Sequence, residues 1–148
     1  MKFKRGGDVW FVDQKFKKQL EEFGVKSKKR MVEAAGNATL KMLENIVVDT
    51  PVDTGLAASN WFVGINEKTD KTTDDTSLNN LIDADKTVSL AKVNPKSDES
   101  FVIYNNIHYI QYLEYGWSVQ APQGMYRKNI VKWRKILEAE AQKVSRQK

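Results

Sequence analysis

The sequence contains no cysteine and only one histidine in 148 residues. Without cysteine there is no disulfide framework, no thiolate nucleophile and no thiolate metal site. The single histidine, His108, would need several carboxylates beside it to complete a metal site, and it lies in no recognisable catalytic triad. No glycine motif of the kind that cradles phosphate is present. These absences argue against the common catalytic centres, so we expect a protein without enzymatic activity and without a cofactor.

Long apolar runs are also missing. No stretch approaches the ~18 consecutive apolar residues that a membrane span needs. The basic start, residues 1–5, has no apolar segment behind it and does not resemble a signal peptide. At 148 residues the chain is long enough for one domain with a sizeable core. We therefore expect a single domain over residues 1–148, made and used in a cytoplasm, with no membrane partner.

The net charge of +5 is unevenly distributed along the chain. Residues 1–30 carry ten Lys or Arg against four Asp or Glu, and residues 126–148 carry eight against two. The middle, residues 31–125, is acidic, with six against thirteen. Basic ends can contact nucleic acid or an acidic neighbour, or simply form solvated helix faces. The candidates for contact with DNA on the last predicted helix are Arg127, Lys128, Lys132, Arg134 and Lys135.

Hydrophobic spacing and turn residues predict the elements of the fold. In chain order we expect an extended arm (1–12), a short helix (13–24), a long helix (27–49), a strand (61–65), a mobile loop (66–76), a short helix from 77 with an ambiguous continuation to 90, a strand (101–104), a helix capped by Asn106 and ended by Gly116, and a last helix (125–144). This order indicates an α+β fold, in which a long N-terminal helix and a C-terminal helix pack on a small, mainly antiparallel sheet.

The segment Thr50-Pro51-Val52-Asp53-Thr54-Gly55 joins the long helix to the first strand. Pro51 disfavours helical geometry at the residue before it, so the helix should end there. Asp53 and Thr54 are short side chains that bond back to the backbone, and Gly55 can take a positive φ. We therefore predict that Pro51, Asp53, Thr54 and Gly55 form a structural turn.

Asp53-Thr54-Gly55 is also the signature of aspartic peptidases, in which an Asp ends a buried apolar strand and two such carboxylates share a proton. Here the preceding segment is helical, and Pro51 is poorly tolerated in a central strand. An aspartic peptidase using Asp53-Thr54-Gly55 is kept as an alternative hypothesis. A non-specific DNA-binding accessory protein is a second alternative.

Four Trp and five Tyr, many of them beside turns, are typical of protein interfaces. Glu114 falls in the last turn of a predicted helix, where the macrodipole disfavours a carboxylate, so we expect it to have a Lys or Arg partner in this chain or another. The aromatic candidates for an interface are Trp61, Tyr109, Tyr112, Tyr115 and Trp117; the alternative is that they belong to the core.

Three motifs follow one another along the chain: Pro51-Val52-Asp53-Thr54-Gly55, then Ile103-Tyr104-Asn105-Asn106 with Tyr109 to Gly116, then Ala121-Pro122-Gln123-Gly124-Met125. Together, over roughly residues 27–145, they resemble the neck or tail-completion proteins of tailed bacteriophages, the HK97 gp10-like family. One departure is His108, which stands where that family commonly has proline.

The resemblance implies a structural virion protein, assembled in the host cytoplasm and located in the neck or tail of the virion. It would form a homo-oligomeric ring, expected to have six subunits, between the head connector and the tail. Its partners would be connector or stopper proteins on one side and the tail terminator or tail tube on the other, with DNA in the lumen. Glu114, Pro122 and Met125 join the candidate interface residues, and the basic candidates would line the lumen or meet an acidic neighbour.

Overall fold

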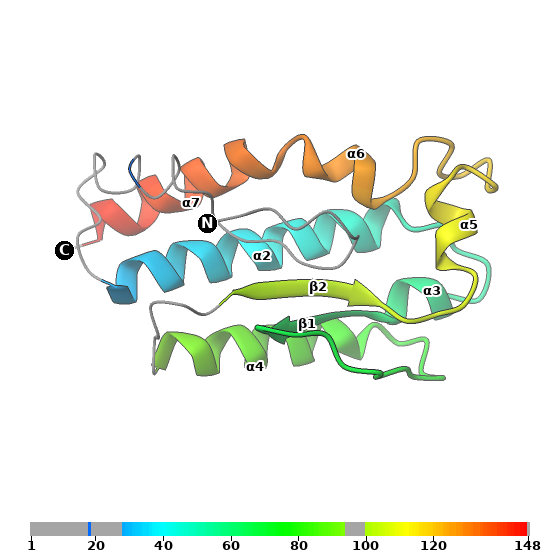
Figure 1. Cartoon of the computed structure of the whole chain (residues 1–148), viewed down its shortest axis with the longest axis horizontal. Coiled ribbons are helices and arrows are strands. Elements are labelled where there is room, and N and C mark those ends of the chain that lie inside the picture. Colours follow the sequence, from blue (N-terminus) through cyan, green and yellow to red (C-terminus); the bar gives the residue numbers. More distant parts are fainter. Residues whose placement is uncertain (1–17, 19–27, 94–99, 148) are drawn as a thin grey trace.

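The structure, a computed structural model, describes Lys18 and residues 28–93 and 100–147. The predicted arm (1–12) lies outside the described residues, as does all of the predicted short helix (13–24) except Lys18. The elements are α2 (Lys28–Asp49), α3 (Leu56–Ser59), β1 (Trp61–Ile65), α4 (Asn79–Val93), β2 (Phe101–Asn105), α5 (Ile110–Glu114), α6 (Tyr126–Ile130) and α7 (Trp133–Arg146) (Figure 1). The α+β class is confirmed.

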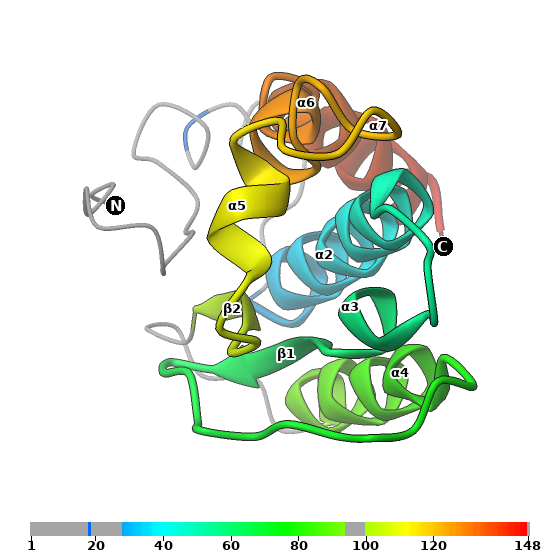
Figure 2. The ribbon, with the colours of Figure 1, turned by 90° about the vertical axis from the view of Figure 1, so that its right-hand side faces the viewer.

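Helix α2 is the central element, and the helices α4 and α7 both pack along it (Figure 2). Ala34 and Ala38 are fully buried against Leu137 and Ala141 of α7. On the side facing α4, a Cβ added at Gly36 would lie 2.6 Å from a methyl carbon of Val88. The small residues of α2 therefore serve close packing within this chain. The C-terminal helix reaches the sheet mainly through α2, since α7 packs chiefly on that helix.

The two strands form an antiparallel pair, joined through α4, in which Trp61 lies opposite Asn105 and Ile65 opposite Phe101. Both predicted strands are confirmed, and β2 is one residue longer than expected. One face of the pair belongs to the main core with α2 and α4, and the other face holds a smaller buried cluster of Phe62, Val102 and Tyr104. Burial on both faces explains why these strands are apolar almost throughout.

Helix α4 is longer than the short helix predicted from residue 77. It begins at Asn79 and continues through the ambiguous segment to Val93. Ala84, Val88 and Ala91 face the core, while Leu78, just before the helix, takes a positive φ of 61°. The segment around residues 86–90 is thus helical.

The prediction of one continuous helix over residues 125–144 is wrong, because the chain forms α6 and α7 with a tightened turn at 131–132. The amide of Asn129, which is fully buried, donates to the Met125 carbonyl oxygen at 2.8 Å and to the Asp49 carboxylate at 2.7 Å. The Lys132 amide then donates to the carbonyl oxygen of Asn129, three residues back, at 2.9 Å. Side-chain bonding to the backbone four residues earlier is a known cause of helix bending.

The predicted cap at Asn106 is also wrong, because α5 begins only at Ile110. The Asn106 amide instead donates to the carbonyl oxygens of Thr69 and Lys71. The predicted end at Gly116 is confirmed. Gly116 has a φ of 85°, its amide donates to the Leu113 carbonyl oxygen, and the Trp117 amide donates to that of Tyr112, which is the pattern of a Schellman motif.

Candidate functional site

The turn after α2 has most of the geometry predicted for it. Gly55 has a φ of 88°, and the Leu56 amide donates to the Thr54 hydroxyl at 3.3 Å. The helix ends before Pro51, where the buried Thr50 hydroxyl donates to the Ile46 carbonyl oxygen at 2.6 Å. That hydroxyl also accepts the indole N–H of Trp61 at 2.9 Å. This side-chain pair ties the end of α2 to the first residue of β1.

Asp53 does not bond the turn as predicted. Its side chain is exposed and has no hydrogen-bond partner among the residues that the structure describes. The bond that holds this part of the turn comes instead from Gln120, whose amide group accepts from the Val52 N–H at 2.9 Å and donates to the Val52 carbonyl oxygen at 3.3 Å. Nothing in the local sequence signals this contact, because the two residues are 68 positions apart.

A cavity of about 220 Å³ lies beside the turn and includes Asp53 in its wall. Its described lining residues are Pro51 to Ala57, Tyr109, Leu113, Ser118 and Gln120. Asp53 supplies the one carboxylate among them. An aspartic peptidase needs two carboxylates that share a proton, so a second copy of the chain would have to bring the other.

Glu114 closes the loop between α5 and α6. Its carboxylate accepts the backbone N–H groups of Met125, Tyr126 and Arg127 at 3.0, 2.9 and 2.8 Å. The Arg127 guanidinium completes the arrangement, with Nε at 3.3 Å from the carboxylate and Nη2 at 2.6 Å from the Glu114 carbonyl oxygen. The predicted Lys or Arg partner is therefore confirmed, and it is Arg127 of the same chain. The carboxylate also caps the first turn of α6, where backbone N–H groups have no helical acceptor.

Gly124 makes this close approach sterically accessible. It has a φ of 77°, and a Cβ at this position would collide with the backbone oxygen and the carboxylate of Glu114. A residue with a side chain would therefore be both strained and obstructed here.

Four exposed side chains gather on α5 and the loop that follows it. Tyr112, Tyr115, Trp117 and Val119 are 51%, 69%, 76% and 96% exposed, and we call them the aromatic end. The rings of Tyr112 and Trp117 lie 4.6 Å apart, which is the hydrophobic contact expected of the Schellman motif. The Tyr115 ring lies 4.8 Å from the Arg127 guanidinium. The three aromatic side chains of this group thus contact neighbours within the chain although they are open to solvent.

Two of the predicted interface residues belong to the core instead. Trp61 is 7% exposed and Met125 is fully buried, so the prediction that their side chains meet a partner is wrong. Glu114 uses its oxygens within the chain, as described above. The interface role of the remaining candidates, Tyr109, Tyr112, Tyr115, Trp117 and Pro122, stays a prediction.

Sequence reasoning missed a second group of exposed apolar side chains, on the outer side of α4. Ile82, Leu90 and Val93 are 55%, 71% and 83% exposed, with the exposed Lys86 between Ile82 and Leu90, and we call the three apolar residues the α4 face. They lie opposite the residues by which α4 packs on the core. Their spacing of eight and three residues would have indicated one helix face, had the helix been extended through residue 93. The two groups belong to separate parts of the domain, since α4 runs along one long side and α5 lies at one end (Figure 1).

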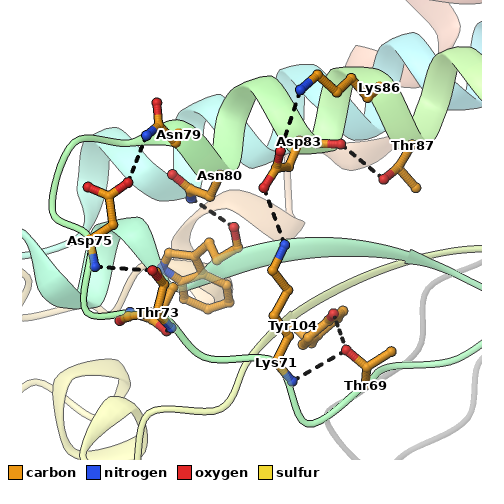
Figure 3. A network of polar contacts seen from close by, with 12 residues as sticks. Thr69, Lys71, Thr73, Asp75, Asn79, Asn80, Asp83, Lys86, Thr87 and Tyr104 are labelled. Carbon is orange, nitrogen blue, oxygen red and sulfur yellow. Dashed lines mark hydrogen bonds and ion pairs between the residues drawn. The ribbon is translucent and has the colours of Figure 1, made fainter.

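The loop over residues 66–76 is attached to the rest of the domain at several points (Figure 3). Thr73 and Asn60 exchange two hydrogen bonds, at 2.8 and 2.9 Å, and the Thr69 and Tyr104 hydroxyls lie 2.8 Å apart. Lys71 pairs with Asp83 of α4 at 3.2 Å. The predicted mobility of this loop stays a prediction, but its contacts place it firmly against β2 and α4.

Most of the predicted DNA-contacting residues have acidic partners within the chain. Arg127 pairs with Glu114, Arg134 pairs with Glu138 at 3.1 Å, and Lys128 pairs with Asp49 at 2.9 Å. Lys132 lies 3.5 Å from the Asn129 amide oxygen, whereas Lys135 has no ion-pair partner among the described residues.

The ionisation of Asp49 reflects these contacts. Its partial burial acts to raise the pKa, but hydrogen bonds from Lys128 and Asn129 and the charges of Lys128 and Lys132 outweigh it and hold the pKa of Asp49 below its usual value. The carboxylate therefore stays charged, and its hydrogen bonds to Lys128 and Asn129 connect the end of α2 to α6.

Within the described residues there is no group of three or more His, Asp or Glu side chains that could hold a metal ion. Over the same residues, no helix is long and apolar enough to cross a membrane. Comparison of the chain with protein-family models, with curated proteins and with solved structures found no match.

Proposed function

We propose that this chain is a structural virion protein of the phage head–tail junction, without enzymatic activity, whose copies join into a ring between the head connector and the tail. The observation that carries this proposal is the presence of two unlike groups of exposed apolar side chains, the aromatic end and the α4 face, on separate elements of one domain. A ring needs a heterologous contact, in which one patch of each copy meets a different patch of the next. Exposed apolar clusters on a folded domain commonly mark such contacts.

The composition of the aromatic end supports the same proposal. Tyr and Trp are enriched where protein interfaces have their strongest contacts. The rings of Trp117 and Tyr112 are in tilted contact, and the Arg127 guanidinium lies over the Tyr115 ring, so each of the three rings has a neighbour within the chain. The motif resemblance supplies the setting: a ring expected to have six subunits, connector or stopper proteins on one side, and the tail terminator or tail tube on the other.

The proposal is tested by the assembly state of the chain. We expect light scattering after size-exclusion chromatography to give a closed oligomer, and negative-stain images to show rings. Trp117→Asp and Leu90→Asp should each give monomers. Val48→Asp is the matched control, because Val48 is 81% exposed but belongs to neither surface; this variant should still assemble.

A mixture of the two defective variants tests whether the contact is heterologous. The Trp117→Asp chain keeps its α4 face and the Leu90→Asp chain keeps its aromatic end, so together they should form a heterodimer with one intact contact and nothing larger. A strictly monomeric wild-type chain, or a mixture that stays monomeric while both single variants are folded, would contradict the proposal.

A further inference from the structure

The outward side of the last two helices carries exposed cations, and one of them, Lys128, is paired with Asp49 at 2.9 Å. Helix α7 packs on α2 through Leu137, Ala141 and Val144. On the opposite side, positions 128, 132, 135, 139, 142 and 146 follow one another every three or four residues, so they share one face. All six are exposed: Lys128, Lys132, Lys135, Ala139, Gln142 and Arg146. We call the three cations among them that have no ion-pair partner in the described residues, Lys132, Lys135 and Arg146, the basic stripe.

The acids of α7 lie off this stripe and are already neutralised. Glu138 pairs with Arg134 at 3.1 Å and Glu140 pairs with Lys143 at 2.7 Å. From Lys132 to Arg146 the stripe extends for about 21 Å, at about 1.5 Å per residue. That length corresponds to about six base pairs of duplex at about 3.4 Å each.

From this arrangement we infer that the basic stripe binds the phosphate backbone of double-stranded nucleic acid, without reading sequence. The residue types favour a polyanion over a protein partner. Protein interfaces are depleted in Lys and enriched in aromatic residues, and the stripe has the reverse composition. It also has no aromatic side chain on which unpaired bases would stack.

The acidic side of a second copy is the competing occupant. Around α4, Asp83 is paired with Lys71 and Lys86, whereas Asp85 is exposed and has no ion-pair partner among the described residues. The composition of the stripe favours the polyanion, and the oligomeric state of the variants separates the two occupants. This inference stands independently of the ring, because the stripe lies on neither the aromatic end nor the α4 face.

The experiment measures the affinity of the full chain for a short labelled DNA duplex by fluorescence anisotropy over a range of salt concentrations. Each phosphate contact contributes about 0.9 to the slope of log affinity against log salt, so Lys132→Gln with Lys135→Gln should reduce the slope by about 1.8 and weaken binding roughly tenfold or more at low salt. Lys132→Arg with Lys135→Arg should restore both. Two duplexes of unrelated sequence should bind equally well.

Arg134→Gln with Lys143→Gln is the matched control. It removes the same charge from the same helix, but from residues paired with acids beside the stripe. Equal loss in test and control variants, or no binding by the wild-type chain, would overturn the inference. The inference would also be overturned if the test variant lost its oligomeric state while its DNA affinity stayed unchanged. It would be overturned as well if the wild-type chain bound anionic vesicles through the stripe and did not bind the duplex. A wild-type monomer that still binds DNA through the stripe would contradict only the ring.

Discussion

Replacement of Glu114 by Ala is the most informative single change in this chain. It would leave three backbone N–H groups at the start of α6 without their acceptor and would remove the partner of the Arg127 guanidinium. The Glu114 side chain is only 15% exposed, so water replaces these bonds poorly. Loss of a helix cap costs about 0.5–2 kcal/mol, and hydrogen bonds to a charged group contribute about 1.5–3 kcal/mol each.

These contributions are not additive, and we expect the free energy of unfolding to fall by about 3 kcal/mol. For a chain of this size that corresponds to a melting temperature lower by roughly 10 °C. Urea denaturation followed by circular dichroism measures the free energy, and hydrogen exchange locates the effect. The amides of Met125, Tyr126 and Arg127 should exchange much faster in the variant.

Glu138→Ala is the control for the loss of a carboxylate. Glu138 makes one ion pair with the exposed Arg134 within its own helix, a type of pair that contributes about 0.3–0.5 kcal/mol. If Glu114→Ala cost no more than Glu138→Ala and left amide exchange at residues 125–127 unchanged, the reasoning about the capped loop would be refuted.

Three further predictions follow from the geometry. Gly124→Ala should lower the free energy of unfolding by about 2 kcal/mol or more, because the added methyl group collides with Glu114 and the positive φ is strained. Gly55→Ala meets only ordinary contacts, so it should cost about 1 kcal/mol in the same denaturation assay. Asp49→Asn should cost about 1 kcal/mol at neutral pH. The pKa of Asp49 is lowered in the folded chain, so the stabilisation by its carboxylate is fully present above the unfolded pKa of 3.8 and is lost as the pH falls through the folded pKa. The free energies of unfolding of wild type and variant should therefore converge in acid. Asp53→Asn should leave stability and assembly unchanged; a peptide-cleaving activity that disappears in this variant would establish the peptidase instead.

The elements with a strong local signal could be predicted from the sequence. The long helix shows regular apolar spacing, and the two strands are short β-branched and aromatic runs between turn residues. The positive φ at Gly55 and the helix end at Gly116 follow from the residue type itself. The need of Glu114 for a cationic partner followed from its place in a helix, without knowledge of the partner's position.

What the sequence could not reveal depends on contacts between distant residues. The break between α6 and α7 contains neither proline nor glycine; it accompanies the contact of the buried Asn129 with Asp49, 80 residues away. Gln120 holds Val52 in the same way. Residue type alone also does not separate core from surface for a large aromatic side chain. Trp61 entered the core because its indole N–H found an acceptor in Thr50, whereas Trp117 stayed outside.

The loop over residues 115–124 is fastened at two points: Glu114, just before it, binds the start of α6, and Gln120, within it, binds the turn after α2. The conformational entropy of the loop is therefore lost when the chain folds, and little remains to be lost when a partner binds. Binding at the aromatic end should accordingly resemble the meeting of two rigid surfaces. It also follows that a substitution at Gln120, outside the aromatic end, would weaken association by restoring freedom to the loop.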